Sequence, residues 1–145
     1  MKRFVFLTAI TLLACSSEPD REQAAVWLTA PESWILNEVT VNGQPVYRNG
    51  KIIEQFGTVS FSRYMKSVRF NPDGTFEGNF DGDSRVYRFQ WVAEDHQVVV
   101  SDTVPNSGQW VIPYRTLLSN SFEMETETSA MDPPNLTRIR LRFGL

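Results

Sequence analysis

Two stretches of the sequence decide the fold: Phe122-Glu123-Met124-Glu125-Thr126-Glu127 and Arg138-Ile139-Arg140-Leu141-Arg142-Phe143. Each alternates a charged side chain with an uncharged one, which is the two-residue period of a β-strand with one buried face. Opposed residues of an antiparallel pair share a face, so the charged residues are expected outside and the uncharged ones inside. A slip of one residue would set Glu against Ile or Leu, so the register is well determined. The predicted pairs are Glu123 with Arg142, Glu125 with Arg140, and Glu127 with Arg138.

The middle of the chain repeats this alternation in shorter runs that turn residues separate. We predict an antiparallel meander there, in which Phe76 lies opposite Phe89 and Trp91 lies opposite Val98. On the inward face of its first two strands this places aromatic residues and one glycine: Phe76, Gly78, Phe80, Tyr87, Phe89 and Trp91.

Turn signals divide the rest of the chain into further short strands. Asn42-Gly43 and Asn49-Gly50 are strong hairpin dipeptides, and Asn71-Pro72-Asp73-Gly74 combines a proline that presets φ with a glycine that accepts positive φ. The connections are of hairpin length and no long helical pattern is present, which favours a barrel over a sandwich. The predicted fold class is therefore all-β: an antiparallel up-and-down β-barrel of about eight strands. The remaining predicted strands lie at 34–41, 46–47, 52–53, 57–61, 66–70 and 110–114.

The N-terminus has the pattern of an export signal. Met1-Lys2-Arg3 is positively charged, and the ten residues from Phe4 to Leu13 are uncharged and mostly apolar. As a helix, that run would rise only about 15 Å, roughly half of the hydrocarbon core of a bilayer, so a permanent span is not expected. Ala14 then places a small residue beside Cys15, an order typical of a secretory signal peptide.

Leu12-Leu13-Ala14-Cys15 also resembles the lipobox of bacterial lipoproteins. The resemblance implies cleavage before Cys15 and a diacylglyceryl thioether on its sulfur, which together with an acylated amine anchors a protein to a membrane. In that family an Asp after the cysteine favours the inner membrane. Ser16 stands there instead, so we expect a cell-envelope protein at the outer membrane, on its periplasmic or surface face. The alternative is that Cys15 is an ordinary residue of an ordinary signal peptide.

A short polar segment separates this signal from the predicted barrel. Asp20 is placed to cap a short helix that runs to about Thr29, although an irregular segment is the alternative. Such a helix is suited to closing one end of a barrel. The predicted organisation is thus a lipoprotein signal peptide over 1–14, a lipidated tether with a possible short helix over 15–32, and a β-barrel domain over 33–145.

Three motifs together resemble the lipocalin-like lipoproteins common in Bacteroidetes. They are the opening strand Ser33–Gly43 with its Trp and Asn-Gly turn, the mid-barrel hairpin Phe70–Phe76, and the closing strand Leu136–Leu141 with its Arg. Glu32-Ser33 departs from the family pattern, which has Gly before the Trp. The resemblance spans most of residues 33–143 and implies a calycin-type barrel of about eight strands. Because most members have no established ligand, it implies a fold rather than a function.

Charge and composition exclude several function classes. The chain carries 14 Lys and Arg against 17 Asp and Glu, and this net charge of −3 becomes more negative once Lys2 and Arg3 are removed. An acidic chain without a basic cluster is poorly suited to phosphate backbones, so no nucleic-acid partner is expected. Cys15 is the only cysteine, so the barrel itself has no disulfide and no thiolate for catalysis.

No residue set in the sequence indicates catalysis or a resident metal. His96, the only histidine, lies in a predicted turn, where a solvated side chain is a simpler interpretation than a catalytic or ligating one. Asp81 and Asp83, with Asp73 one hairpin away, offer hard oxygen ligands for Ca²⁺, but they lack the ligand count of a recognised loop. We therefore expect no metal, no cofactor and no enzymatic activity.

The aromatic residues expected inside the barrel are the remaining candidates for a site. The interior of an eight-stranded barrel is either filled by side chains or holds one small ligand, and Gly78 leaves space that favours a cavity or only relieves a bend. We predict that the barrel binds a small apolar or amphipathic molecule. The alternative is a filled barrel that engages an envelope protein through the loops 102–109 and 129–135. The candidate ligand-binding residues are Trp34, Phe76, Phe80, Tyr87, Phe89, Trp91, Trp110 and Tyr114.

Overall fold

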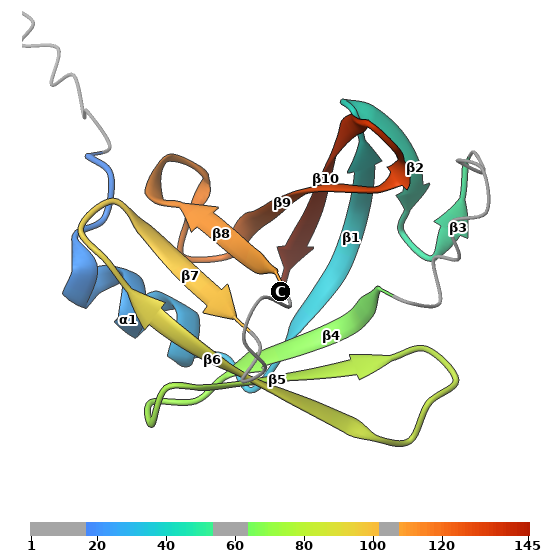
Figure 1. Ribbon diagram of the computed structural model, residues 1–145. Helices are drawn as coiled ribbons and strands as arrows, with labels where there is room; N and C mark the ends of the chain where they lie inside the picture. The colour runs from blue at the N-terminus through green and yellow to red at the C-terminus, as the bar shows by residue number, and fades with distance from the viewer. Residues whose placement is uncertain (1–16, 54–63, 102–107) are drawn as a thin grey trace, which may run out of the picture.

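The chain folds into a closed antiparallel β-barrel, seen in the computed structural model, which describes residues 17–53, 64–101 and 108–145 (Figure 1). The barrel closes because β10 pairs with β9 along one edge and with β1 along the other. This confirms the predicted fold class. Among the described residues, eight strands form the ring: β1 (Trp34–Val41), β4 (Met65–Phe70), β5 (Thr75–Phe80), β6 (Val86–Ala93), β7 (Gln97–Ser101), β8 (Gln109–Pro113), β9 (Ser121–Asp132) and β10 (Asn135–Gly144).

A small hairpin, β2 (Gln44–Arg48) with β3 (Lys51–Ile52), extends from β1 beside the ring. Its two turns lie at the predicted dipeptides. Asn42 and Gly43 have φ of 50° and 82°, and Asn49 and Gly50 have φ of 49° and 82°. Two successive residues with positive φ are what a two-residue type I′ turn requires, and Asn followed by Gly adopts this conformation most readily.

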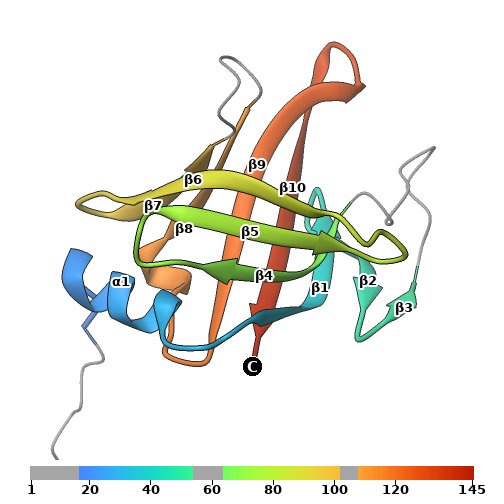
Figure 2. The ribbon, with the colours of Figure 1, turned by 90° about the horizontal axis from the view of Figure 1, so that it is seen from below.

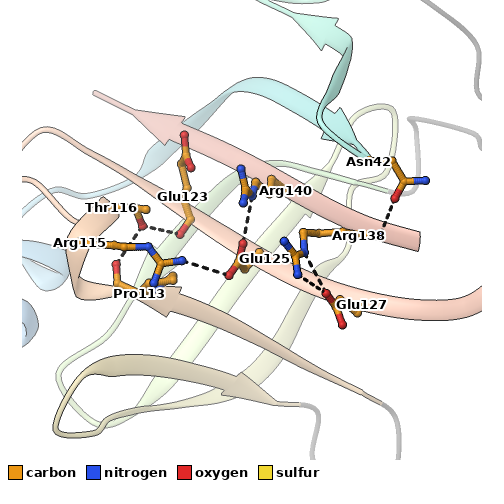
Figure 3. A network of polar contacts seen from close by, with 9 residues as sticks. All are labelled: Asn42, Pro113, Arg115, Thr116, Glu123, Glu125, Glu127, Arg138 and Arg140. Atoms are coloured by element: carbon orange, nitrogen blue, oxygen red, sulfur yellow. Dashed lines mark hydrogen bonds and ion pairs between the residues drawn. The ribbon is translucent and has the colours of Figure 1, made fainter. Parts of the chain in front are cut away.

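The β9–β10 hairpin has the predicted register: Glu123 is opposite Arg142, Glu125 opposite Arg140, and Glu127 opposite Arg138. Figure 3 shows that Glu125 lies between two arginines: the Nε atom of Arg140 donates to it at 3.0 Å, and the Arg115 guanidinium lies 3.7 Å away. The uncharged residues of both strands line the core, where Met124 and Leu141 are each less than 5% exposed.

Two details of the strand predictions are wrong. Trp91 pairs with Val100 and not with Val98, because Glu94 N–H donates to the Gln97 carbonyl and leaves a two-residue turn that sets the register of the hairpin. The segment 129–135, predicted as a loop, continues β9 to Asp132 and starts β10 at Asn135, so it forms the tip of a hairpin. The predicted strand 57–61 and most of the predicted loop 102–109 lie outside the described residues.

The helix α1 (Arg21–Thr29) forms where the sequence predicts it. The carboxylate of Asp20 accepts a 2.8 Å hydrogen bond from the Gln23 N–H, which satisfies one of the unpaired donors of the first turn. Ala24 and Leu28 are fully buried in the same core as the barrel strands. Figure 2 shows α1 alongside β4, at the end of the barrel opposite the β9–β10 tip. In the part of the chain that is described, no helix has the length and apolar character needed to span a membrane.

Candidate functional site

The barrel encloses a cavity of about 190 Å³. Its wall includes Met65 at the start of β4, Phe80 at the end of β5, and Trp110 at the start of β8. These strand ends lie away from the β6–β7 turn, whose Asp95 forms an ion pair with Arg21 of α1. The cavity therefore lies toward the end of the barrel away from α1. The lining residues are Tyr64, Met65, Phe76, Phe80, Phe89, Val100, Gly108, Trp110, Met124, Leu141 and Phe143.

Four of the eight predicted ligand-binding residues line this cavity, namely Phe76, Phe80, Phe89 and Trp110. Phe76 and Phe89 lie opposite each other on β5 and β6, as predicted, with ring centroids 6.0 Å apart in an edge-to-face arrangement. Such pairs add stability beyond the area they bury, so this contact stabilises one side of the cavity wall.

The other four predicted residues do not line the cavity, and each uses its polar atom in a structural contact. The indole of Trp34 donates to the Leu28 carbonyl at 3.0 Å, and that of Trp91 donates to the Asn71 carbonyl at 2.9 Å. The hydroxyl of Tyr114 donates to the carbonyl of Glu94. Tyr87 donates to the Asp83 carboxylate at 2.9 Å. Trp and Tyr side chains need such partners when they leave water, and backbone carbonyls supply three of the four.

Several lining residues were not predicted from the sequence as part of the site. The alternation that predicted the β9–β10 hairpin also predicted an inward orientation for three of them, Met124, Leu141 and Phe143. Tyr64 and Met65 carried no such signal, because a β-bulge interrupts the alternation at the start of β4.

That bulge decides which side chain of β4 enters the cavity. Met65 pairs with Phe80 and Ser67 with Asn79, so Lys66 is an extra residue on its strand. Lys66 stays outside, where its ammonium group lies 3.0 Å from the carboxylate of Asp81. Met65 turns inward over Gly78: a Cβ atom added to this glycine would lie 2.0 Å from the Met65 sulfur. The space left by Gly78 is thus filled by Met65.

The described part of the cavity wall is largely apolar. None of the described lining residues carries a charged side chain, and the polar groups among them are the phenol of Tyr64 and the indole of Trp110. Tyr64 is 8% exposed, and burial raises the pKa of its hydroxyl above the ordinary value. The phenol therefore stays neutral at physiological pH. The described lining suits an uncharged molecule, because it offers an ion no counter-charge in place of the hydration that the ion would lose.

The β5–β6 turn supports one edge of the site. Phe80 packs edge-to-face on Tyr87 with ring centroids 4.9 Å apart, and Arg85 lies over the Tyr87 ring at 5.3 Å. The guanidinium of Arg85 and the hydroxyl of Tyr87 both donate to Asp83, and they hold the pKa of its carboxyl well below its usual range. Phe80 therefore packs against a side chain, Tyr87, that is hydrogen-bonded to the turn.

The three carboxylates considered as Ca²⁺ ligands each contact another group of the chain. Asp83 is engaged by Arg85, Asp81 by Lys66, and Asp73 accepts from the backbone N–H of Thr75 at 2.9 Å. Within the described ranges, no group of three or more His, Cys, Asp or Glu side chains is placed to hold a metal ion. His96 is exposed in the β6–β7 turn, where the sequence predicted it.

Comparison with known proteins adds one structural likeness. No protein-family model and no curated protein matches the sequence. The structure is similar to that of the "Bovine Odorant Binding Protein deswapped triple mutant", with a TM-score of 0.42 and 14% sequence identity over 77% of this chain and 70% of that one. The assignment of the barrel rests on the strand pairing of the chain itself.

Proposed function

We propose that this protein binds a small, uncharged, apolar molecule inside its barrel. The observation that carries the proposal is the cavity of about 190 Å³ with its aromatic and aliphatic wall. One water molecule occupies about 30 Å³, and an apolar cavity of about 150 Å³ in another protein stays dry and binds benzene or xenon. The volume therefore matches a molecule somewhat larger than benzene.

Burial of apolar surface supplies the affinity. Each CH₂ group transferred from water contributes about 0.8 kcal/mol, which is about a fourfold gain in affinity. That gain continues only while the added group still fits, because interiors close-packed around aromatic rings resist overfilling. Binding along a series of n-alkylbenzenes should therefore strengthen from benzene upward and weaken beyond one chain length.

The experiment is a calorimetric titration of the purified barrel with benzene, toluene, ethylbenzene, propylbenzene and butylbenzene. The expected result is saturable binding of one molecule per chain, with an optimum inside the series. A negative heat-capacity change should accompany it, because apolar surface leaves water. Absence of saturable binding for every member of the series would contradict the proposal.

A binding role is favoured over the two alternatives. The interaction-protein alternative assumed a filled barrel, and the cavity favours a ligand instead. An enzyme needs groups that accept or donate protons, or a nucleophile with its base. The described lining offers only Tyr64 and Trp110 as polar side chains, and the hydroxyl of Tyr64 stays protonated.

We further propose that Cys15 carries a lipid that holds the barrel at the cell envelope, with the outer membrane favoured by Ser16. Leu12-Leu13-Ala14-Cys15 and the apolar run before it support this proposal. In a bacterial host, the wild-type chain should incorporate labelled palmitate and sediment with membranes. Cys15→Ser should incorporate none, and Ser16→Ala is the matched control that should still be labelled. Equal membrane partition of both variants would contradict the lipid anchor.

A further inference from the structure

We infer that Met65, seated over Gly78, sets the size of the molecule that the cavity accepts. The inference rests on the proposed function, since it names the residue that determines specificity at that site.

The β4 bulge places Met65 where simple alternation would place a lysine. Val68 and Phe70 point into the core, so an unbroken strand would turn Lys66 to the same side. The extra residue at Lys66 restores the pairing with β5, leaves Lys66 in its contact with Asp81, and brings Met65 inward. Bulges of this kind re-aim a side chain, here into the cavity.

Gly78 provides the place that Met65 occupies. It lies between Phe76 and Phe80 on the inward face of β5, and both phenylalanines line the cavity. A Cβ atom on Gly78 would lie 2.0 Å from Sδ of Met65 and 2.8 Å from both its Cγ and its Cε. No side chain larger than hydrogen fits there while Met65 keeps its position. The two residues therefore form one unit of the wall.

Met65 is also more flexible than the aromatic rings beside it, a property that it shares with Met124 of the same wall. A methionine is unbranched, has three rotatable side-chain bonds and tolerates irregular spaces, and its sulfur makes favourable contacts with aromatic rings. The neighbouring rings have fewer rotatable bonds and pack edge-to-face, Phe76 with Phe89 and Phe80 with Tyr87. A ligand that exceeds the cavity can thus displace Met65 more readily than the rings.

A coupling experiment tests this unit in the alkylbenzene series. Met65→Ala should move the optimum to a longer alkyl chain, and it should strengthen binding of that longer ligand by about fourfold per added methylene. Gly78→Ala should push Met65 into the cavity and weaken the ligand that is optimal for wild type by about tenfold or more. In the Met65→Ala background, Gly78→Ala should change affinity by less than about threefold, because its clash is gone.

Met124 supplies the matched control. It lines the same cavity from β9 and is 3% exposed, whereas the three atoms nearest to a Cβ on Gly78 all belong to Met65. Met124→Ala should enlarge the cavity as well, yet Gly78→Ala should retain its full effect in that background. Equal effects of Gly78→Ala with and without Met65, or an unchanged optimum in Met65→Ala, would overturn the inference.

A second measurement needs no variant of Gly78 and covers the case in which that variant fails to fold. In wild-type protein labelled at the methionine methyl groups, butylbenzene should shift the Met65 resonance more than toluene does. The Met124 resonance should change by a similar amount with both ligands. If Met65 does not respond to ligand size, the inference fails. If no alkylbenzene binds wild type at all, the proposed function fails with it, so the two failures are distinguishable.

Discussion

The indole N–H of Trp34 donates a 3.0 Å hydrogen bond to the backbone carbonyl of Leu28, so the first barrel strand is tied to the last turn of α1. Trp34 is fully buried, and its ring meets Phe122 of β9 edge-to-face at 5.1 Å. A single side chain thus joins the helix to strands from both ends of the sequence. This contact packs the end of the core that α1 covers, and Phe122 in turn stacks on Phe143 of the cavity wall at 5.1 Å.

Trp34→Phe should destabilise the protein without changing ligand binding. The substitution leaves the buried Leu28 carbonyl without its donor, which lowers the free energy of unfolding by about 1–3 kcal/mol. Trp27→Phe is the matched control, because Trp27 lies half-buried on the same helix. Urea unfolding measures the difference, and calorimetry checks affinity. Loss of binding in folded Trp34→Phe would place Trp34 in the site, against the structure.

Val100→Phe should abolish ligand binding by filling the cavity. Val100 lines the cavity on β7 and is 2% exposed, whereas Val92 on the adjacent β6 is 60% exposed. Val92→Phe adds the same atoms to the outer surface and should bind ethylbenzene like wild type. The measurement is calorimetric titration of both variants, after circular dichroism has shown that both are folded. Equal affinity of the two variants would mean that the ligand binds elsewhere.

Ligand binding should be independent of pH between about 5 and 9. The titratable group of the described lining is the phenol of Tyr64, and burial raises its pKa. Its neutral form is fully populated below the ordinary tyrosine pKa of about 10, and any stability linked to it is lost only as the pH rises through the higher folded pKa. Titrations at five pH values test this. A bell-shaped or stepwise profile in that range would point to a charged group at the ligand.

The contribution of the Asp83 carboxylate to the stability of the fold should persist in mild acid. Its hydrogen bonds with Arg85 and Tyr87 lower the pKa of the Asp83 carboxyl in the folded state. The contribution of this group to stability is therefore complete above the ordinary carboxyl pKa of about 3.9, and it is lost as the pH falls from there through the lower folded pKa. The stability difference between wild type and Asp83→Asn should stay constant from pH 7 to about 5 and shrink below about pH 4. A difference that changes between pH 7 and 5 would contradict this assignment.

The charged ladder, the three Glu–Arg pairs across β9 and β10, should guide strand pairing more than it stabilises the fold. Glu125 and Arg140 are partly exposed, and ion pairs of this kind contribute about 0.2–1 kcal/mol in double-mutant cycles. A cycle with Glu125→Ala and Arg140→Ala, measured by urea unfolding, should give a coupling in that range. A coupling of several kcal/mol would mean that the ladder dominates the stability of the hairpin.

The alternation of residue types along a strand predicted the register of a hairpin where the side chains permit a single favourable pairing. The Glu–Arg alternation of β9 and β10 permits one low-energy pairing, and it occurs. The β6–β7 register was predicted two residues off, because Glu94 to Gln97 allow more than one turn and a backbone hydrogen bond selects between them. Alternation is preserved by a two-residue shift, so the inward face of β6 was still predicted correctly.

The site was predicted less completely than the fold. Alternation indicates which face a residue occupies and not how far along the barrel it lies, so Trp34 and Trp91 could not be separated from Phe89 and Trp110. The β4 bulge changes the face of Met65 through an extra residue that has no sequence signature of its own. Gly78 predicted unfilled space on the inner face of β5, and in the structure the side chain of Met65 occupies that space.

The most direct test of ligand binding in the barrel is a crystal of the protein soaked with iodobenzene, with the iodine located by its anomalous scattering. We expect one strong peak inside the barrel, bordered by Phe76, Trp110 and Leu141. Anomalous peaks confined to the outer surface, with the cavity empty at saturating iodobenzene, would contradict it.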